Sequence, residues 1–347
     1  MRKTAIFKDD LFLKHDPGYG HVESPSRLEV IYEQLNNPEL NKKFLFPSFS
    51  PATREILELN HSEALIERVS WTRGKPSASL DPDTRTSPDS FDAACLAAGA
   101  VVDGTKMLFD GEIDNCFALV RPPGHHAEAD RAMGFCLFNN VAVAAHYAIQ
   151  RLNKERILIV DWDLHHGNGT QHSFYGSDQV LYFSTHQYPH YPGTGAAYEV
   201  GTGHGEGYTI NIPLPGGQDD AFFAAIFNSI LAPIVKEYQP ECIMVSAGFD
   251  IYKEDPLGGM NVTADGFAYM TRKLRALADE VCDGRLLVTL EGGYNLTGLR
   301  DGALAVLFEL AEGNGMDAAT AKHLKNATLP SNVLEETQNI AKKYWKM

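Results

Sequence analysis

Short apolar runs alternate along this chain with longer stretches of helix-forming composition. The runs are apolar throughout, which is typical of strands that are covered on both faces. Strands of this kind alternating with helices predict an α/β domain, with a central, mostly parallel sheet flanked by helices. The apolar runs are residues 116–120, 157–160, 180–183, 243–245 and 286–290.

Helices are predicted between these strands, where length and composition favour them. The predicted helices cover residues 90–109, 139–151, 219–238 and 264–282. No repeat, low-complexity tract or linker interrupts the 347 residues, so we expect a single domain. A catalytic core of about residues 1–312 is expected to precede a more polar segment, about 313–347, with a helix over 331–344.

Composition narrows the class of protein. Hydrophobic residues make up 44% of the chain and charged residues 22%, which is near the average for soluble domains. We find no apolar run of membrane-spanning length and no signal-peptide pattern, so we expect a cytoplasmic protein without a membrane partner. The net charge of −15 argues against direct nucleic-acid binding, which needs clustered Lys and Arg. It suits a cationic partner, or simply a soluble surface.

The cysteine pattern indicates neither a disulfide framework nor a cysteine metal site. The chain has 5 cysteines, an odd number, with no Cys-x-x-Cys pair, and most of them lie inside apolar runs. We therefore expect reduced thiols in the core.

Chemically active residues follow several predicted strands. His125 and His126 follow the first apolar run, residues 161–165 the second, Asp250 the fourth and Tyr294 the fifth. In open α/β sheets, ligands bind in the crevice at the carboxyl ends of the strands. We therefore expect these residues to converge on an active site at that edge.

Asp163, His165 and Asp250 are the candidate metal ligands. Asp163 and His165 are alternate residues, so their side chains point the same way if the backbone is still extended there. Each residue alone is more often a helix cap or a hydrogen-bonded core group, but together they favour a metal site. Three protein ligands leave a position open for water, as in catalytic zinc sites. A mixed carboxylate and imidazole set can also accept iron or cobalt.

Two adjacent histidines supply the candidate proton-transfer groups. His125 and His126 follow a proline-rich turn, and two imidazoles can divide the work: one accepts a proton from water while the other stays charged. Asp161 and Asn168 are placed to set their tautomer and charge. Tyr294 follows a Glu-Gly-Gly turn, and its hydroxyl can donate to a developing oxyanion.

These motifs resemble the zinc-dependent histone deacetylase family, which includes bacterial deacetylase-like amidohydrolases and acetylpolyamine amidohydrolases of the arginase–deacetylase fold. The likeness keeps its order over most of the chain. Asp-Trp-Asp-Leu-His-His-Gly-Asn-Gly-Thr-Gln-His and Leu-Glu-Gly-Gly-Tyr-Asn look most like the class II branch. The matching segments are residues 21–27, 121–140, 161–174, 246–259 and 290–295.

The resemblance implies an active zinc deacetylase. Asp163, His165 and Asp250 would hold zinc, and Tyr294 would polarise the acetyl carbonyl. It also assigns His126 with Asn168 as general base and then acid, and His125 with Asp161 as the electrostatic partner. One or two structural potassium ions are implied as well: the first at Asp161, Ser184 and Thr185, the second at Phe174, Ser177, Val180 and Tyr208.

The resemblance also places residues around the substrate. Arg27 would lie in the internal pocket through which acetate leaves, and a rim carboxylate would come from Asp83 or Asp81. The acyl tunnel would be walled by Gly134, Phe135 and Tyr191.

Leu257 bears on the choice of substrate. Polyamine-specific relatives can carry Glu at this position, and an apolar residue offers no charge to a second ammonium. We therefore expect acetylated lysine of a peptide or protein as the substrate, with acetylated polyamine as the alternative. An acyl-lysine binding module without turnover ranks third, and a ureohydrolase last. The sequence does not determine the oligomeric state, and a dimer and a tetramer both remain open.

Overall fold

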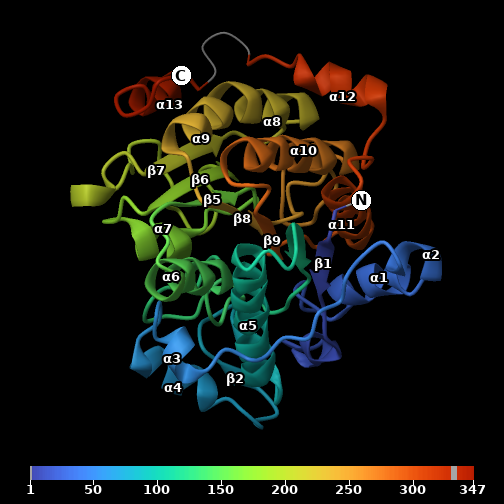
Figure 1. Cartoon of the computed structure of the whole chain (residues 1–347). Coiled ribbons are helices and arrows are strands. Elements are labelled where there is room, and N and C mark those ends of the chain that lie inside the picture. The colour runs from blue at the N-terminus through green and yellow to red at the C-terminus, as the bar shows by residue number, and fades with distance from the viewer. Residues whose placement is uncertain (1, 330–333) are drawn as a thin grey trace.

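A seven-stranded sheet forms the centre of the molecule, as the sequence predicts (Figure 1). The computed structural model describes residues 2–329 and 334–347. Neighbouring strands are parallel throughout, in the order β1-β4-β9-β8-β5-β6-β7. In that order the strands are β1 (Thr4–Phe7), β4 (Asn115–Ala118), β9 (Leu286–Leu290), β8 (Cys242–Ala247), β5 (Ile157–Asp161), β6 (Val180–Gln187) and β7 (Thr209–Leu214).

The two edge strands, β1 and β7, are the ones that the apolar runs do not predict. β1 has only four residues. β7 contains Asn211 and Pro213, which interrupt its apolar character. Proline is tolerated at the edge of a sheet because one side of the backbone there needs no partner strand.

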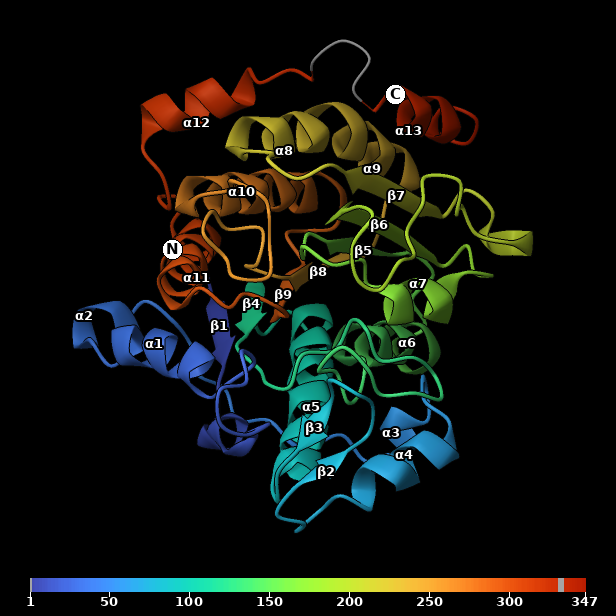
Figure 2. The same cartoon turned by 180° about the vertical axis from the view of Figure 1, so that it is seen from behind.

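Helices cover both faces of the sheet, as the α/β prediction requires (Figure 2). On one face lie α5 (Ser90–Phe109) and α6 (Asn140–Leu152). On the other lie α8 (Asp220–Ile226), α9 (Ala232–Tyr238) and α10 (Ala264–Val281). A π turn, η3 (Phe227–Leu231), joins α8 to α9, so the helix predicted over 219–238 is one stretch with a widened turn.

The other elements of the described chain extend this frame. They are η1 (Asp10–Lys14), α1 (Ser26–Leu35), α2 (Pro38–Asn41), α3 (Arg54–Leu57), α4 (Glu63–Ser70), β2 (Ala78–Ser79), β3 (Arg85–Thr86), α7 (Asn168–Phe174), η2 (Gly203–Gly205), α11 (Leu296–Ala311), α12 (Ala318–Lys325) and α13 (Glu335–Ala341). β2 and β3 pair as a separate antiparallel ribbon. The cysteines are all buried and free, as predicted.

One expectation about composition is wrong. The stretch Asp220–Tyr238 is long and apolar enough to cross a membrane by length and composition alone. In the fold, 67% of that stretch is buried, and its helices pack against α10 and α12. A helix that is apolar on most sides is typical of a core position, which explains its composition.

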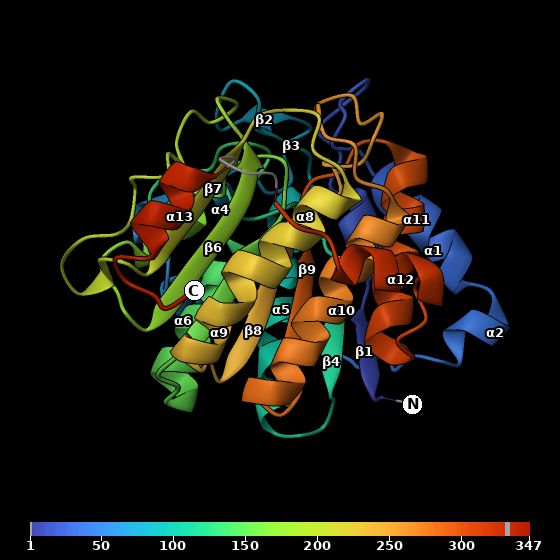
Figure 3. The same cartoon turned by 90° about the horizontal axis from the view of Figure 1, so that it is seen from above.

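The C-terminal segment packs back onto the domain. α12 lies against α8 and α10, where Leu324 joins a small cluster with Ala224 and Tyr269. α13 lies beside the edge strand β7, opposite the β1 edge where the chain begins (Figure 3). α13 covers less than the predicted 331–344, since it begins at Glu335 and ends at Ala341, and positions 331–333 lie outside the described residues.

Candidate active site and metal centre

Four neighbouring strands lead into the candidate site. β4, β9, β8 and β5 lie side by side in the sheet, and each ends shortly before one of the predicted motifs. Because the four strands are parallel, their carboxyl ends open at the same edge. Side chains from distant parts of the sequence, His125, Tyr294, Asp250 and Asp163, therefore meet there.

Asp163, His165 and Asp250 form a buried cluster in which one ligand atom of each lies within 4.8 Å of the others. The Nδ1 of His165 is 3.2 Å from an Asp163 oxygen and 3.1 Å from an Asp250 oxygen. β5 ends at Asp161, so a loop and not an extended strand brings Asp163 and His165 together. Backbone N–H groups of Gly292 and Leu164 donate to Asp163 and Asp250 at 2.8 and 2.9 Å and hold the two carboxylates in place.

The surroundings of this cluster fit a metal ion. A Cβ atom at Gly248 would lie 2.0 Å from an Asp163 oxygen, and one at Gly292 would lie 2.3 Å from an Asp250 oxygen, so only glycine leaves room. Burial, and then the charge of Asp163, raise the pKa of Asp250 to about 7. A divalent cation would relieve the repulsion between the two carboxylates, and zinc accepts carboxylate and imidazole ligands.

His125 is held in its charged form. Its Nδ1 lies 3.0 Å from Asp161, whose carboxylate also accepts from the Tyr182 hydroxyl at 3.0 Å. Burial opposes a charged ring, but the nearby carboxylates, chiefly Asp163 and Asp161, outweigh burial and raise the pKa of His125 well above its usual value.

His126 is held in its neutral form. Its Nδ1 lies 2.8 Å from the Oδ1 of Asn168, and its ring packs edge-on against Tyr191 with 5.1 Å between ring centroids. Burial, and then the charges of His125 and His165, lower the pKa of His126 well below its usual value. The surroundings of the two adjacent histidines therefore favour different forms, the charged form for His125 and the neutral form for His126.

A pocket of about 350 Å³ opens onto this cluster. Gly134 and Phe135 form part of its wall with successive positive φ angles of 57° and 68°. Gly134 is required there because a Cβ atom would lie 2.5 Å from the His126 ring. The lining residues are Asp83, His126, Gly134, Phe135, His165, His190, Tyr191, Pro256, Leu257 and Tyr294.

The sequence leaves open whether Asp83 or Asp81 is the rim carboxylate, and the pocket lining distinguishes them. Asp83 lines the pocket and Asp81 does not. Asp83 accepts a hydrogen bond from the backbone N–H of Gly134 at 3.2 Å, so it lies next to the part of the pocket wall that Gly134 forms.

Arg27 lies behind the pocket and not among its lining residues. It is fully buried, and its guanidinium is 5.0 Å from the centre of the Tyr294 ring. It donates to the carbonyl of Gly293 at 2.7 Å and forms an ion pair with Glu23 at 3.1 Å. Arg27 therefore supports the turn that carries Tyr294.

The structure also places the predicted potassium ligands. In the sheet register Asp161 is aligned with Ser184, and the hydroxyl of the next residue, Thr185, is buried without a hydrogen-bond partner among the described residues. The second set lies around the loops before β6 and β7. There the Ser177 N–H donates to the Phe174 carbonyl at 2.9 Å, the Tyr208 carbonyl accepts from Tyr182 at 2.9 Å, and Val180 begins β6.

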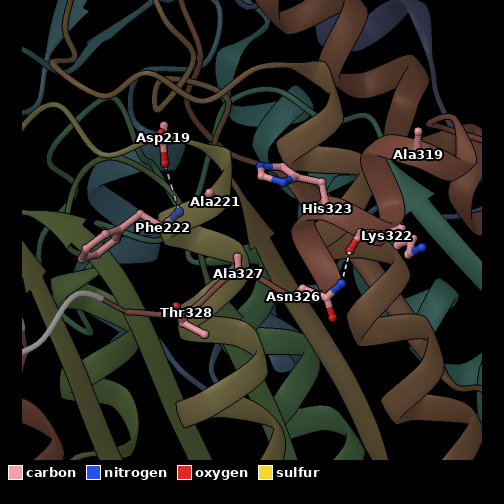
Figure 4. A pocket seen from close by; sticks show the side chains of 9 residues that line it. All are labelled: Asp219, Ala221, Phe222, Ala319, Lys322, His323, Asn326, Ala327 and Thr328. Carbon is pink, nitrogen blue, oxygen red and sulfur yellow. Dashed lines mark hydrogen bonds between the residues drawn. The ribbon is translucent and has the colours of Figure 1, made fainter.

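A larger hollow of about 530 Å³ lies elsewhere, between α8 and α12 (Figure 4). Asp219, Phe222 and Lys322 are among its lining residues, and none of the predicted site residues is. Asp219 is already used as the N-cap of α8, where it accepts from the Phe222 N–H at 3.0 Å. The smaller pocket is therefore the better candidate for the chemistry.

Sequence reasoning assigned no role to several groups around the site, of which Glu291 is fully buried and Glu128 and His190 are partly buried. Glu291 accepts from the backbone of Gly124 at 2.6 Å and from the Ser246 hydroxyl at 3.0 Å, and burial raises its pKa to about 7. Its place directly after a buried strand could have identified it. Glu128 and the pocket residue His190 carry no such signal, because their contacts depend on loop geometry.

Comparisons with known proteins agree on one family. Residues 21–310 match the family described as "Histone deacetylase domain". The "Probable deacetylase" of Archaeoglobus fulgidus is 37% identical over 99% of both chains. "Histone deacetylase 18" of Arabidopsis thaliana is 40% identical over 99% of this chain but only 52% of its own length, so this chain spans about half of that plant protein.

A solved structure shows the same arrangement of elements. "Crystal Structure of HDA15 HD domain" matches with a TM-score of 0.89 and 38% identity, over 99% of this chain and 95% of that chain. At this level of identity over almost the whole length, both the fold and the family are shown. This chain therefore belongs to the histone deacetylase family, and it is a deacetylase by its domain and its relatives.

Proposed function

We propose that this protein is a zinc-dependent amidohydrolase that removes the acetyl group from N-acetyl-lysine in peptides or proteins and releases acetate. The observation that carries the proposal is geometric: His126, bonded through Nδ1 to Asn168, and His165 of the buried Asp163, His165 and Asp250 cluster line the same 350 Å³ pocket. The pocket is walled by aromatic rings, which suit the apolar stem of a lysine side chain.

Zinc held by Asp163, His165 and Asp250 would supply a Lewis acid that polarises a carbonyl and lowers the pKa of water. Phe135 and Tyr191 line the pocket and would hold the lysine stem between them.

The chain's own groups then divide the reaction between them. Tyr294 stays protonated, since burial raises its pKa well above the usual value, and its hydroxyl donates to the carbonyl oxygen as negative charge develops. His126 accepts a proton from the attacking water and gives it to the lysine nitrogen as the amide C–N bond breaks. His125 remains a cation and favours the anionic transition state. The products are acetate and the free amine.

A structural potassium ion is part of the same proposal. Two features support the first site: the Thr185 hydroxyl has no hydrogen-bond partner in the described part of the chain, and Asp161 is aligned with Ser184. The second site, at Phe174, Ser177, Val180 and Tyr208, is proposed from the family resemblance alone.

Acetylpolyamine deacetylation is the second candidate function. The observation that favours it is the Asp83 carboxylate in the pocket lining, which could attract a second ammonium. Leu257, in the same lining, opposes it because an apolar side chain gives such a charge no partner.

The test is a comparison of kcat/KM for the zinc-reconstituted protein on an acetyl-lysine peptide, acetylputrescine and acetylspermidine. A clear preference for the peptide supports lysine deacetylation. A clear preference for the polyamines would replace it with the second candidate, and turnover of none of the three would contradict the proposal.

A further inference from the structure

A second carboxylate lies behind Asn168 and takes no part in the proposed chemistry. The Oε1 of Glu128 accepts a hydrogen bond from the Nδ2 of Asn168 at 2.5 Å. On the other side, both oxygens of Glu128 lie 2.9 Å from the Nδ1 of His172. These contacts form a chain from the buried His126 through Asn168 and Glu128 to His172, whose side chain is half exposed.

The Asn168 side chain has one accepting end and one donating end, and the end that faces His126 decides which of its ring nitrogens carries the proton. Its carbonyl oxygen can only accept a hydrogen bond, and its NH2 group can only donate. Glu128 is ionised, because its bonds to His172 and Asn168 lower its pKa despite burial, so it can only accept. The NH2 group must therefore face Glu128, and the carbonyl oxygen must face the Nδ1 of His126.

The NH2 group has further acceptors on the same side. It donates to the backbone carbonyl of His126 at 3.3 Å, and the sulfur of Met133 lies 3.6 Å away. A rotated amide would point its oxygen at the Glu128 carboxylate and at this carbonyl. Of these groups only Glu128 carries a charge, so it contributes the most to the orientation.

Packing fixes the position of the His126 ring but not the nitrogen that carries the proton. Gly134 and Tyr191 enclose the ring from the pocket side and make no hydrogen bond to its nitrogens. The tautomer is therefore set by the group that faces Nδ1. With the Asn168 oxygen there, Nδ1 carries the proton and Nε2 keeps its lone pair.

We propose that Glu128 is a positioning residue for the deacetylation, which orients the Asn168 amide so that His126 holds its proton on Nδ1 and can accept one on Nε2. His172 steadies Glu128 from the solvent side. The consequence for catalysis rests on the proposed function of His126, whereas the orientation of Asn168 and the tautomer of His126 do not.

The first experiment compares Glu128→Ala with the wild type in zinc-loaded protein labelled with 15N-histidine. We expect the His126 signals, assigned by their loss in His126→Ala, to change from the Nδ1–H tautomer to a mixture. We expect kcat on an acetyl-lysine peptide to fall about 10- to 100-fold with KM unchanged, as for other residues that orient a catalytic group. Glu280→Ala is the matched control, since Glu280 pairs with Lys236 on the helical surface far from this chain of contacts, and it should change neither readout.

A second variant separates orientation from general damage. Aspartate at position 168 has no donor end and needs no orienting, so Asn168→Asp should restore most of the lost kcat in the Glu128→Ala background. In the wild-type background the same substitution places two carboxylates together and should lower kcat. An equal loss in both backgrounds, or a Glu128→Ala protein with wild-type tautomer and kcat, would overturn the proposal.

Two outcomes need their own readout. If Glu128→Ala does not fold, Glu128→Gln replaces it, because glutamine keeps the shape but can face either end of the Asn168 amide. We then expect a smaller shift of His126 to mixed tautomers. An unchanged His126 tautomer in this variant argues against the proposal. If the wild type releases no acetate from any acetylated amine, the proposed function fails, and the tautomer comparison still decides the role of Glu128.

Discussion

Replacing Tyr294 by phenylalanine tests the oxyanion donor with almost no other change to the molecule. Tyr294 lines the pocket, and its hydroxyl makes no hydrogen bond to another residue of the described chain, although its backbone N–H donates to Asp255 at 2.7 Å. The ring contacts with Arg27 and Phe135 remain in the variant. We therefore expect the free energy of unfolding to change by less than about 0.5 kcal/mol.

The effect on catalysis should be much larger. Removing one donor from an oxyanion site costs about 10²- to 10³-fold in kcat, or about 2.7–4 kcal/mol of transition-state stabilisation. Because the hydroxyl acts on charge that develops only in the transition state, KM should stay nearly constant. The assay is acetate release from an acetyl-lysine peptide at saturating zinc, together with a thermal melt of the same preparation.

Tyr191→Phe is the matched control for this prediction. It removes a hydroxyl from the same pocket, but from a ring assigned only to substrate contact, so kcat should stay within about threefold of the wild type. If Tyr294→Phe also stays within that range, Tyr294 is not the oxyanion donor. If its melting temperature falls sharply, the residue has a structural role that this reasoning omits.

Three further predictions address the pocket and the acid stability of the fold. Phe135→Ala removes an aromatic side chain from the pocket wall, and burying a lysine stem against such a side chain contributes about 1.5–3 kcal/mol to binding. KM for an acetyl-lysine peptide should therefore rise roughly tenfold or more, with a smaller change in kcat. An unchanged KM would show that Phe135 does not contact the substrate. Leu257→Glu places a carboxylate beside the pocket, so the ratio of kcat/KM for acetylspermidine to that for the peptide should rise at low salt. An unchanged ratio would show that a charge at position 257 does not affect the choice of substrate. Burial lowers the pKa of His61 to about 4, while the unfolded chain titrates near 6.5, so the unfolded state binds more protons in this window. The free energy of unfolding should therefore fall by up to about 3 kcal/mol from this group as the pH drops from 6.5 to 4, and denaturant melts of His61→Gln should show a shallower fall; parallel curves would contradict the assignment.

Much of the fold follows from the sequence because the central strands are apolar on both faces. The runs that became β4, β5, β6, β8 and β9 have no polar alternation, and the helix predicted over 90–109 matches α5 (Ser90–Phe109). The sequence does not predict β7, because an edge strand is solvated on one side and tolerates Asn211 and Pro213. The π turn between α8 and α9 depends on packing, which a periodic pattern does not report.

Some residues of the candidate site could likewise be predicted from the sequence, and others could not. Asp163, His165 and Asp250 could be proposed together because each follows a strand, and parallel strands bring their carboxyl ends to one edge. Glu128 could not be found in this way. Its contact with Asn168 joins the loop after β4 to the first turn of α7, and no residue spacing encodes that contact.

The central claim is that a metal at the Asp163, His165 and Asp250 cluster is required for acetyl-lysine hydrolysis in this pocket. The most direct measurement is a zinc titration of the chelator-treated protein, with bound zinc and acetate release from an acetyl-lysine peptide followed on the same samples. We predict that activity is absent without metal, rises in proportion to bound zinc and reaches its maximum at about one zinc per chain. Hydrolysis at an undiminished rate by the metal-free protein, or bound zinc that Asp250→Ala does not reduce, would contradict the account.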